Sequence, residues 1–273
     1  MKTSCLLAIA SGKGGVGKTW FAATLAHTLA HPSAQPAAQH VAHSFGRARR
    51  RILLLDADLG LANVDIQLGL TPARDLADVL GGRADLAAAV MPHAEGGFDI
   101  LAGRSGSGAL GTLEGGALAA FCRVVEDARA AYDVVILDLG AGVDRTVRRL
   151  AALGDTLVVL ATEEPTSITD AYAVLKLHGA DCPGGDRRVV VNQASSPASG
   201  ARTYGVLARA ARQFLGSAPP LAGVIRRDPA VPAAIRRQSL LLSQHPGSRA
   251  AADVRALGEP LLRPPVPASV PAA

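Results

Sequence analysis

One glycine-rich octapeptide near the N-terminus constrains the fold of this chain more than any other feature. The segment Gly12–Thr19 reads GKGGVGKT and matches the pattern G-x-x-x-x-G-K-[ST] at every fixed position. An apolar run, Ser4–Ala10, precedes it, and the spacing of apolar residues predicts a helix over Trp20–Ala30. A strand, a glycine-rich loop and a helix in this order form the phosphate-binding loop of P-loop proteins. We therefore expect a nucleotide site at the end of the first strand of a parallel sheet.

The residue types in this loop have separate tasks. Glycines let backbone N–H groups converge on phosphate oxygens, where a side chain would block the approach, and the N-terminus of the following helix attracts the same anion. Lys18 is expected to reach the β- and γ-phosphates of ATP, and Thr19 to ligate Mg²⁺. The nucleotide-binding residues expected in the loop are Gly12, Lys13, Gly14, Gly15, Val16, Gly17, Lys18 and Thr19. A chance glycine-rich turn is the alternative, and the complete match with both flanks argues against it.

Short apolar runs alternate with helical patterns along the rest of the chain. The expected strands are Ser4–Ala10, Arg51–Asp56, Phe98–Leu101, Asp133–Asp138, Thr156–Thr162, Arg188–Asn192 and Leu221–Ile225. The helical patterns are Trp20–Ala30, Ala117–Ala131, Ser167–Leu177, Ala201–Phe214 and Ser248–Leu262. Because the strands are apolar along their whole length, we expect an α/β fold with a doubly wound, mostly parallel sheet that helices cover on both faces.

We expect a single domain, residues 1–263, with two segments that break the pattern. Residues 31–50 are rich in Ala, His, Pro, Gln and Arg and show no clear period, which predicts a flexible surface insertion. Residues 264–273 are rich in Pro and Ala, which predicts a disordered tail.

Composition excludes several classes of protein. Aromatic residues make up only 3%, so stacking platforms for single-stranded nucleic acid are not expected, and the mild net charge of +5 is interpreted as solvated surface rather than a DNA-binding face. The N-terminal apolar run is too short for a signal peptide, and no stretch of apolar residues is long enough to span a membrane. The three cysteines are scattered and odd in number, so we expect buried free thiols and a cytoplasmic location.

Carboxylates follow two of the expected strands. Asp56 and Asp58 come at the end of one strand, and Asp138 comes at the end of another. The carboxyl ends of parallel strands form the binding edge of such a sheet. Asp138 after four apolar residues is a Walker B-like arrangement, which binds Mg²⁺ through water. A helix cap is the alternative for Asp138.

The loop resembles the deviant Walker A motif of the MinD/ParA class because a second lysine, Lys13, precedes the usual one. The resemblance implies a P-loop NTPase fold of the SIMIBI class and a slow ATP hydrolase. It also implies that two ATP-bound subunits face each other and that Lys13 crosses to the partner's phosphates. The catalytic residues would then be Lys13, Lys18 and Asp58. A solvated Lys13 without such a role is the alternative.

Within that class, three segments resemble the FlhG family, which regulates flagellar number. They are Asp56–Asp65 (DADLGLANVD), Asp138–Gly142 (DLGAG) and Glu163–Tyr172 (EEPTSITDAY). The resemblance implies that Asp58 orients the attacking water and that Asp56 supports the Mg²⁺ shell, with Thr19 and Asp138 as the other metal residues.

The same resemblance assigns further residues. Asn63 and Asp65 would shape a switch that depends on the dimer, although Asp65 is equally well explained as a helix cap. Glu164 and Asp170 would pair with the signature lysine, Lys13, in one nucleotide state; solvated acids beside a capped helix are the alternative, above all for Asp170.

Two more expectations concern the end of the strand Arg188–Asn192 and the start of the Ser167–Leu177 helix. By the same resemblance Asn192 would read adenine, since an amide can both donate to and accept from the base edge. The backbone of the later segment Ile225–Pro229 would close over the base, and its arginines are equally well explained as surface. Thr166 and Ser167 are expected to cap the helix that follows them.

Two residues depart from the family pattern. Trp20 stands where many relatives have a small polar residue, and Leu139 stands where FlhG chains usually have threonine. Trp20 either offers its backbone N–H to the α-phosphate or simply packs under the loop.

The expected partners are a second copy of the chain and either the flagellar GTPase FlhF or a flagellar transcription regulator. The helical pattern Ser248–Leu262 carries few basic residues, so we interpret it as the last helix of the domain and expect weak or no membrane binding. The alternatives are a MinD- or ParA-type positioning or partition ATPase, or a nucleotide-binding regulator that does not hydrolyse ATP.

Overall fold

The computed structural model describes residues 4–31, 50–103 and 115–264, and all structural statements concern these ranges. Apart from their end residues, the expected flexible insertion 31–50 and the expected disordered tail 264–273 lie outside the described residues.

An eight-stranded sheet forms the centre of the fold, in the order β3-β4-β2-β5-β1-β6-β7-β8. The strands are β1 (Cys5–Ser11), β2 (Ile52–Ala57), β3 (Met91–His93), β4 (Phe98–Leu101), β5 (Val134–Ala141), β6 (Thr156–Ala161), β7 (Asp186–Ala194) and β8 (Leu221–Arg226). All neighbouring pairs are parallel except β3 and β4, which are antiparallel. The expected mostly parallel α/β sheet is confirmed. β3 was not expected because its three residues, MPH, carry no apolar run.

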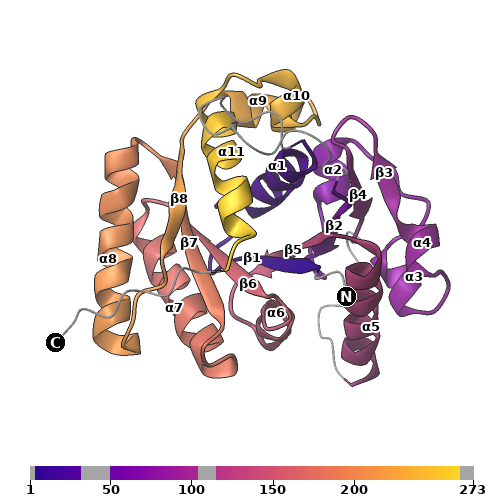
Figure 1. Ribbon diagram of the computed structural model, residues 1–273, viewed down its shortest axis with the longest axis horizontal. Helices are drawn as coiled ribbons and strands as arrows, with labels where there is room; N and C mark the ends of the chain where they lie inside the picture. The colour runs from indigo at the N-terminus through magenta and orange to yellow at the C-terminus, as the bar shows by residue number, and fades with distance from the viewer. Residues whose placement is uncertain (1–3, 32–49, 104–114, 265–273) are drawn as a thin grey trace.

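Helices cover both faces of this sheet (Figure 1). On one face lie α1 (Lys18–Ala30), α2 (Val64–Leu68), α9 (Ala230–Arg236), α10 (Leu241–Gln244) and α11 (Arg249–Leu261). On the other lie α3 (Leu76–Leu80), α4 (Leu86–Ala89), α5 (Gly116–Ala131), α6 (Arg145–Ala151), α7 (Pro165–Asp181) and α8 (Pro197–Leu215). In β1, Leu6 and Ala8 pack into one core cluster and Leu7 and Ile9 into the other. This two-sided burial is why the strands are apolar throughout.

The last described helix belongs to the core. The apolar residues Val254, Leu257 and Leu261 of α11 are buried against the sheet and α1. The pattern Ser248–Leu262 therefore forms a helix as expected, and its apolar face is already used in the core. No helix in the described ranges is both long and apolar enough to cross a bilayer. The three cysteines are free, as expected, but all are half-buried rather than buried.

The topology places one end of the sheet at a switch point. β1 lies between β5 and β6, and the carboxyl ends of all the parallel strands meet at the same edge. Ligands of open α/β sheets bind in the crevice at such an edge. The expected phosphate loop falls there, together with Asp56 near the end of β2, Asp58 just after it and Asp138, which lies within β5 because this strand runs three residues beyond the expected end.

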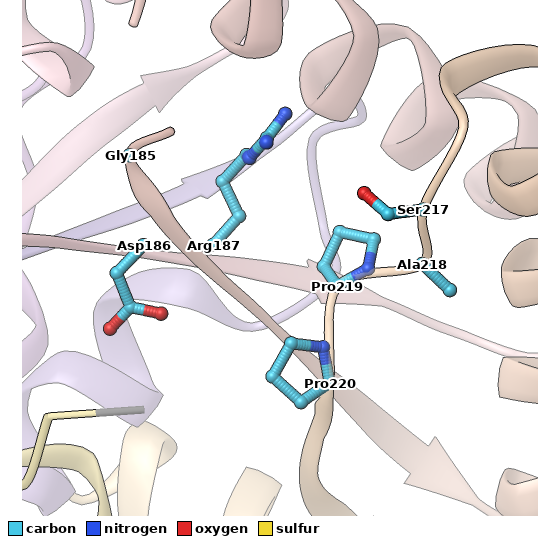
Figure 2. A pocket seen from close by; sticks show the side chains of 7 residues that line it. All are labelled: Gly185, Asp186, Arg187, Ser217, Ala218, Pro219 and Pro220. Atoms are coloured by element: carbon cyan, nitrogen blue, oxygen red, sulfur yellow. The ribbon is translucent and has the colours of Figure 1, made fainter. Parts of the chain in front are cut away.

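A pocket of about 170 Å³ lies at the opposite edge (Figure 2). Its lining comes from the residues that precede or begin β7 and β8, among them Asp186, Arg187 and Pro219. Figure 2 shows the side chains of Asp186 and Arg187 pointing to opposite sides of β7. This pocket is separate from the carboxyl edge, where the phosphate loop and the carboxylates lie.

Candidate nucleotide site

The phosphate loop needs glycine at two positions for reasons of space. At Gly12 a Cβ atom would lie 2.4 Å from the carbonyl oxygen of Asp170 in α7, and at Gly17 it would lie 2.6 Å from Nδ2 of Asn192. Gly17 also has a φ of 91°, in the left-handed region that favours glycine. The loop is therefore packed against the ends of β7 and α7 on one side, which leaves its other side for a ligand.

Side chains hold the carbonyl groups of this loop. Nδ2 of Asn192 donates to the carbonyl of Val16 at 2.8 Å, and Nε2 of Gln193 donates to the carbonyl of Gly15 at 3.2 Å. Oδ1 of Asn192 accepts from the backbone N–H of Gln193 at 2.9 Å. The Asn192 amide thus faces the phosphate loop in this structure, and its expected contact with adenine stays a prediction.

Two carboxylates are buried side by side below the loop. Asp56 in β2 and Asp138 in β5 are partners in the strand register, and their exposed fractions are 0% and 1%. Burial raises the pKa of Asp138, and the neighbouring Asp56 raises it further, while the hydroxyl of Thr19 and the charge of Lys18 lower it. Burial likewise raises the pKa of Asp56.

Asp138 fits a divalent cation. Its Oδ1 atom is buried and has no hydrogen-bond partner among the described residues, and Thr19 supplies a hydroxyl beside it. Hard oxygen ligands of this kind suit Mg²⁺. A cation there would compensate the two carboxylates, whose ionised forms burial otherwise disfavours.

Asp56 also fixes the segment that follows β2. Its Oδ2 accepts from the backbone N–H groups of Asn63 at 2.9 Å and Val64 at 3.0 Å, so it satisfies donors at the start of α2. The interpretation of Asp65 as a helix cap is wrong, because α2 begins at Val64 and Asn63 occupies the cap position.

Asp58 lies between this segment and β5. Its Oδ1 accepts from the N–H groups of Gly60 at 3.3 Å and Leu61 at 3.0 Å. A Cβ atom at Gly140 would lie 3.3 Å from the same oxygen, so the glycine lets β5 approach the carboxylate closely. The structure thus gathers Asp56, Asp58 and Asp138 at one edge.

Lys13 forms an ion pair within the chain. Its Nζ lies 2.5 Å from Oε2 of Glu164 and 3.2 Å from Oγ1 of Thr166. The hydrogen bond and the charge of Lys13 lower the pKa of Glu164. The expected pairing of Glu164 with the signature lysine is therefore present in this state, whereas Asp170 meets the loop through its backbone next to Gly12.

Sequence comparison assigns the family. The chain is 35% identical over 264 residues to the antiactivator FleN of Pseudomonas aeruginosa, a match that covers 97% of this chain and 88% of the relative. The chain belongs to the FlhG/FleN family of MinD/ParA-class P-loop ATPases. It is also 30% identical to the flagellum site-determining protein YlxH of Helicobacter pylori, over 77% of this chain and 65% of that protein. The chain matches no protein-family model.

The fold of this FlhG-family chain is that of known MinD structures. It superposes on the Mg-ADP complex of the septum site-determining protein MinD from Pyrococcus horikoshii with a TM-score of 0.74 and 21% identity, over 94% of this chain and 96% of the other. This structural similarity agrees with the doubly wound, mostly parallel sheet described above.

Both departures from the FlhG-family pattern lie in the core. Trp20 and Leu139 are 5% and 1% exposed, and they belong to the clusters on opposite faces of the sheet. Trp20 therefore packs below the loop, as one of its two interpretations held.

The prediction that Thr166 and Ser167 cap α7 is wrong. The helix begins at Pro165 with Glu164 in the cap position and no side-chain cap bond. Oγ of Ser167 instead accepts from the N–H of Thr162 at 2.9 Å, and Thr166 contacts Lys13. Proline at the first helical position lacks an N–H and presets the turn, which reduces the need for a capping side chain.

Several contacts of this FlhG-family site had no sequence signal. Glu163 accepts from the N–H of Ser195 at 3.1 Å and so joins the ends of β6 and β7. Arg226 pairs with Asp253 of α11 at 2.7 Å, so its side chain is held by an ion pair rather than free on the surface, and the expected backbone contact of this segment with the base stays a prediction. Gln193 was missed as well, because a glutamine after a strand is an ordinary sequence feature.

Proposed function

We propose that this chain is a Mg·ATP-dependent ATPase that dimerises and acts as a switch in the control of flagellar number or assembly. The observation that carries the proposal is the GKGGVGKT loop beside the buried carboxylate of Asp138. The Oδ1 atom of this carboxylate has no hydrogen-bond partner among the described residues. We take residues 1–263 as one ATPase domain located in the cytoplasm.

The roles of the residues follow from their chemistry. Glycine N–H groups of the loop bind phosphate oxygens, and Lys18 adds a positive charge at the β- and γ-phosphates. Thr19 and Asp138 hold Mg²⁺, with Asp56 behind them, and the ion neutralises charge on the phosphates. Asp58 orients the attacking water. Asn192 remains the candidate for adenine recognition.

Lys13 has the role that separates this class from other P-loop proteins. In the monomer it is neutralised by Glu164. In a dimer it would reach the partner's phosphates, where a cation offsets the repulsion between two ATP molecules and stabilises charge in the transition state. Dimerisation and hydrolysis would therefore depend on the same residue.

The relatives support the flagellar process. One is an antiactivator and another determines the site of a flagellum, so a flagellar transcription regulator or the GTPase FlhF is the proposed protein partner. DNA binding and strong membrane binding are not part of the proposal. Since the apolar face of α11 is buried, vesicles of anionic lipid should not sediment the protein strongly.

A regulator without turnover is the second candidate, favoured by Leu139 in place of a threonine hydroxyl. A phosphate-release assay on the purified protein, with Asp58→Ala as the matched blank, separates the two. ATP-dependent release that the Asp58→Ala variant lacks supports the ATPase. Tight ATP binding without phosphate release in either protein would instead support the second candidate, a regulator without turnover.

A further inference from the structure

Two residues of the described chain other than glycine have a left-handed backbone, and both are glutamines. Gln193 has a φ of 57° and Gln238 a φ of 51°. This region costs free energy for a residue with a Cβ atom, and Asn, Asp and Gly tolerate it better than Gln. Such conformations persist when the surrounding structure holds them, and they cluster at functional sites.

The left-handed residue Gln193 turns the chain back toward the phosphate loop. It follows Asn192 at the end of β7, where the pairing of β7 with β8 shifts register between Val191 and Ala194. The shift lets two consecutive side chains address the same loop: Asn192 donates to Val16 and Gln193 to Gly15. The Asn192 carbonyl oxygen accepts from the Gln193 N–H, so the two side chains are also held relative to each other.

The physical need for such donors comes from how a phosphate loop works. Its successive N–H groups must converge on an anion, which turns the carbonyl groups of the same peptides outward. An outward carbonyl that is packed against protein, such as that of buried Val16, loses water and needs a donor, whereas at the exposed Gly15 the Gln193 amide replaces water and fixes the direction of the carbonyl. The exposed fraction of Asn192 is only 3%, so its amide supplies that donor where water cannot.

We propose that Asn192 and Gln193 are positioning residues of the phosphate loop, which hold the Val16 and Gly15 carbonyls outward and so set the loop for a triphosphate. The inference rests on the proposed nucleotide binding and deepens it. It differs from base recognition, because a residue that sets the loop affects every triphosphate equally, whereas a residue that reads adenine affects only ligands that carry that base.

The test measures the affinities of Gln193→Gly and wild type for ATP, ITP and inorganic triphosphate, with Mg²⁺, by titration calorimetry. ITP differs from ATP in the base alone. Glycine adopts the left-handed backbone without strain, so the melting temperature of the variant should stay level or rise. The substitution also removes the amide that donates to Gly15. All three affinities should fall by the same factor, about fivefold, as for one lost hydrogen bond. A residue that served only the fold would lower the melting temperature and leave the affinities level.

Three further measurements make the outcome decisive. Gln238→Gly is the matched control, since it removes another left-handed glutamine, whose amide donates to the Ile66 carbonyl in α2. It should leave the affinity for inorganic triphosphate unchanged. Gln193→Leu keeps the side-chain volume but also removes the amide donor, and it should lower the three affinities by the same factor as Gln193→Gly, whatever its melting temperature. Asn192→Leu should lower the affinity for inorganic triphosphate, because the Val16 carbonyl loses its donor whatever base the ligand carries.

Two results would overturn the inference. One is full affinity of the Gln193 variants for inorganic triphosphate. The other is a loss confined to ATP in Asn192→Leu, which would assign Asn192 to the base. Failure of the wild-type protein to bind ATP at all is a different result, because it would refute the proposed function itself.

Discussion

The Lys13 ammonium group lies 2.5 Å from the Glu164 carboxylate, although 151 positions separate the two residues in the chain. Their side chains are 40% and 64% exposed, so water screens the pair and a stronger anion can displace Glu164. The phosphates of a second ATP molecule are such an anion. The observed Lys13–Glu164 pair is therefore compatible with the proposed role of Lys13 across a dimer.

Lys13→Ala should still bind ATP as a monomer but should fail to dimerise and should lose most of its turnover. The reason is that no cation would then offset the repulsion between two facing nucleotides. Light scattering with a non-hydrolysable ATP analogue measures the dimer. Lys176→Ala, which removes an exposed lysine of α7, is the control and should dimerise normally. A dimer of normal strength in Lys13→Ala would contradict the trans role.

Lys18→Ala should abolish ATP binding. Lys18 lies at the start of α1, where its charge acts on Asp138 in the absence of ligand. The other lysine of the loop, Lys13, is paired with Glu164 and does not replace it. Titration calorimetry checks this expectation, and micromolar ATP affinity in the variant would refute the role of Lys18.

Asp58→Ala should retain ATP binding and trap the dimer, while hydrolysis stops. Within the described ranges the carboxylate accepts from two backbone N–H groups of an exposed turn, so the fold should tolerate its removal at a cost of about 1 kcal/mol. A single-turnover assay measures the effect on hydrolysis. Turnover at the wild-type rate would move the water-positioning role to another residue.

Without Mg²⁺, the contribution of Asp56 and Asp138 to stability should fall as pH rises from about 4 to about 7, whereas buried His27, whose pKa is lowered to about 4, contributes with the opposite sign in both the wild type and an Asp138 variant. In this window the unfolded chain has already lost protons that the folded chain keeps on Asp56 and Asp138, because burial raises their pKa. Above both folded pKa values the loss is complete. Asp138→Asn should therefore have a higher melting temperature than the wild type at pH 8 in EDTA.

Thermal melts between pH 4.5 and pH 8 test this expectation. Asp127→Asn, which changes an exposed carboxylate of α5, is the control and should follow the wild-type curve. Addition of Mg·ATP at pH 8 should stabilise the wild type by several degrees and Asp138→Asn much less, because a bound ligand stabilises only the state that holds it. An equal gain in both proteins would remove Asp138 from the metal site.

The local sequence determined much of this protein. The Gly12–Thr19 pattern, the two-sided apolar strands and the aspartate after the apolar run Val134–Leu137 predicted the sheet, the loop and its metal-binding edge, because each depends on residue type and spacing within a few positions. The three-residue strand β3 and short helices such as α2 escaped, since too few residues carry their periodicity.

Tertiary structure decided which side chains serve the loop. Nothing near Gln193 in the sequence indicates a left-handed backbone or a bond to Gly15, which lies 178 positions away. Nor does the sequence show that the Asp56 carboxylate accepts from the backbone N–H of Val64 at the start of α2, while it lies beside Asp138 in the neighbouring strand. A sequence pattern reports the face and period of one element. The partner of a polar group depends instead on which strand ends the fold brings to the same edge, and that is fixed only when the whole sheet has formed.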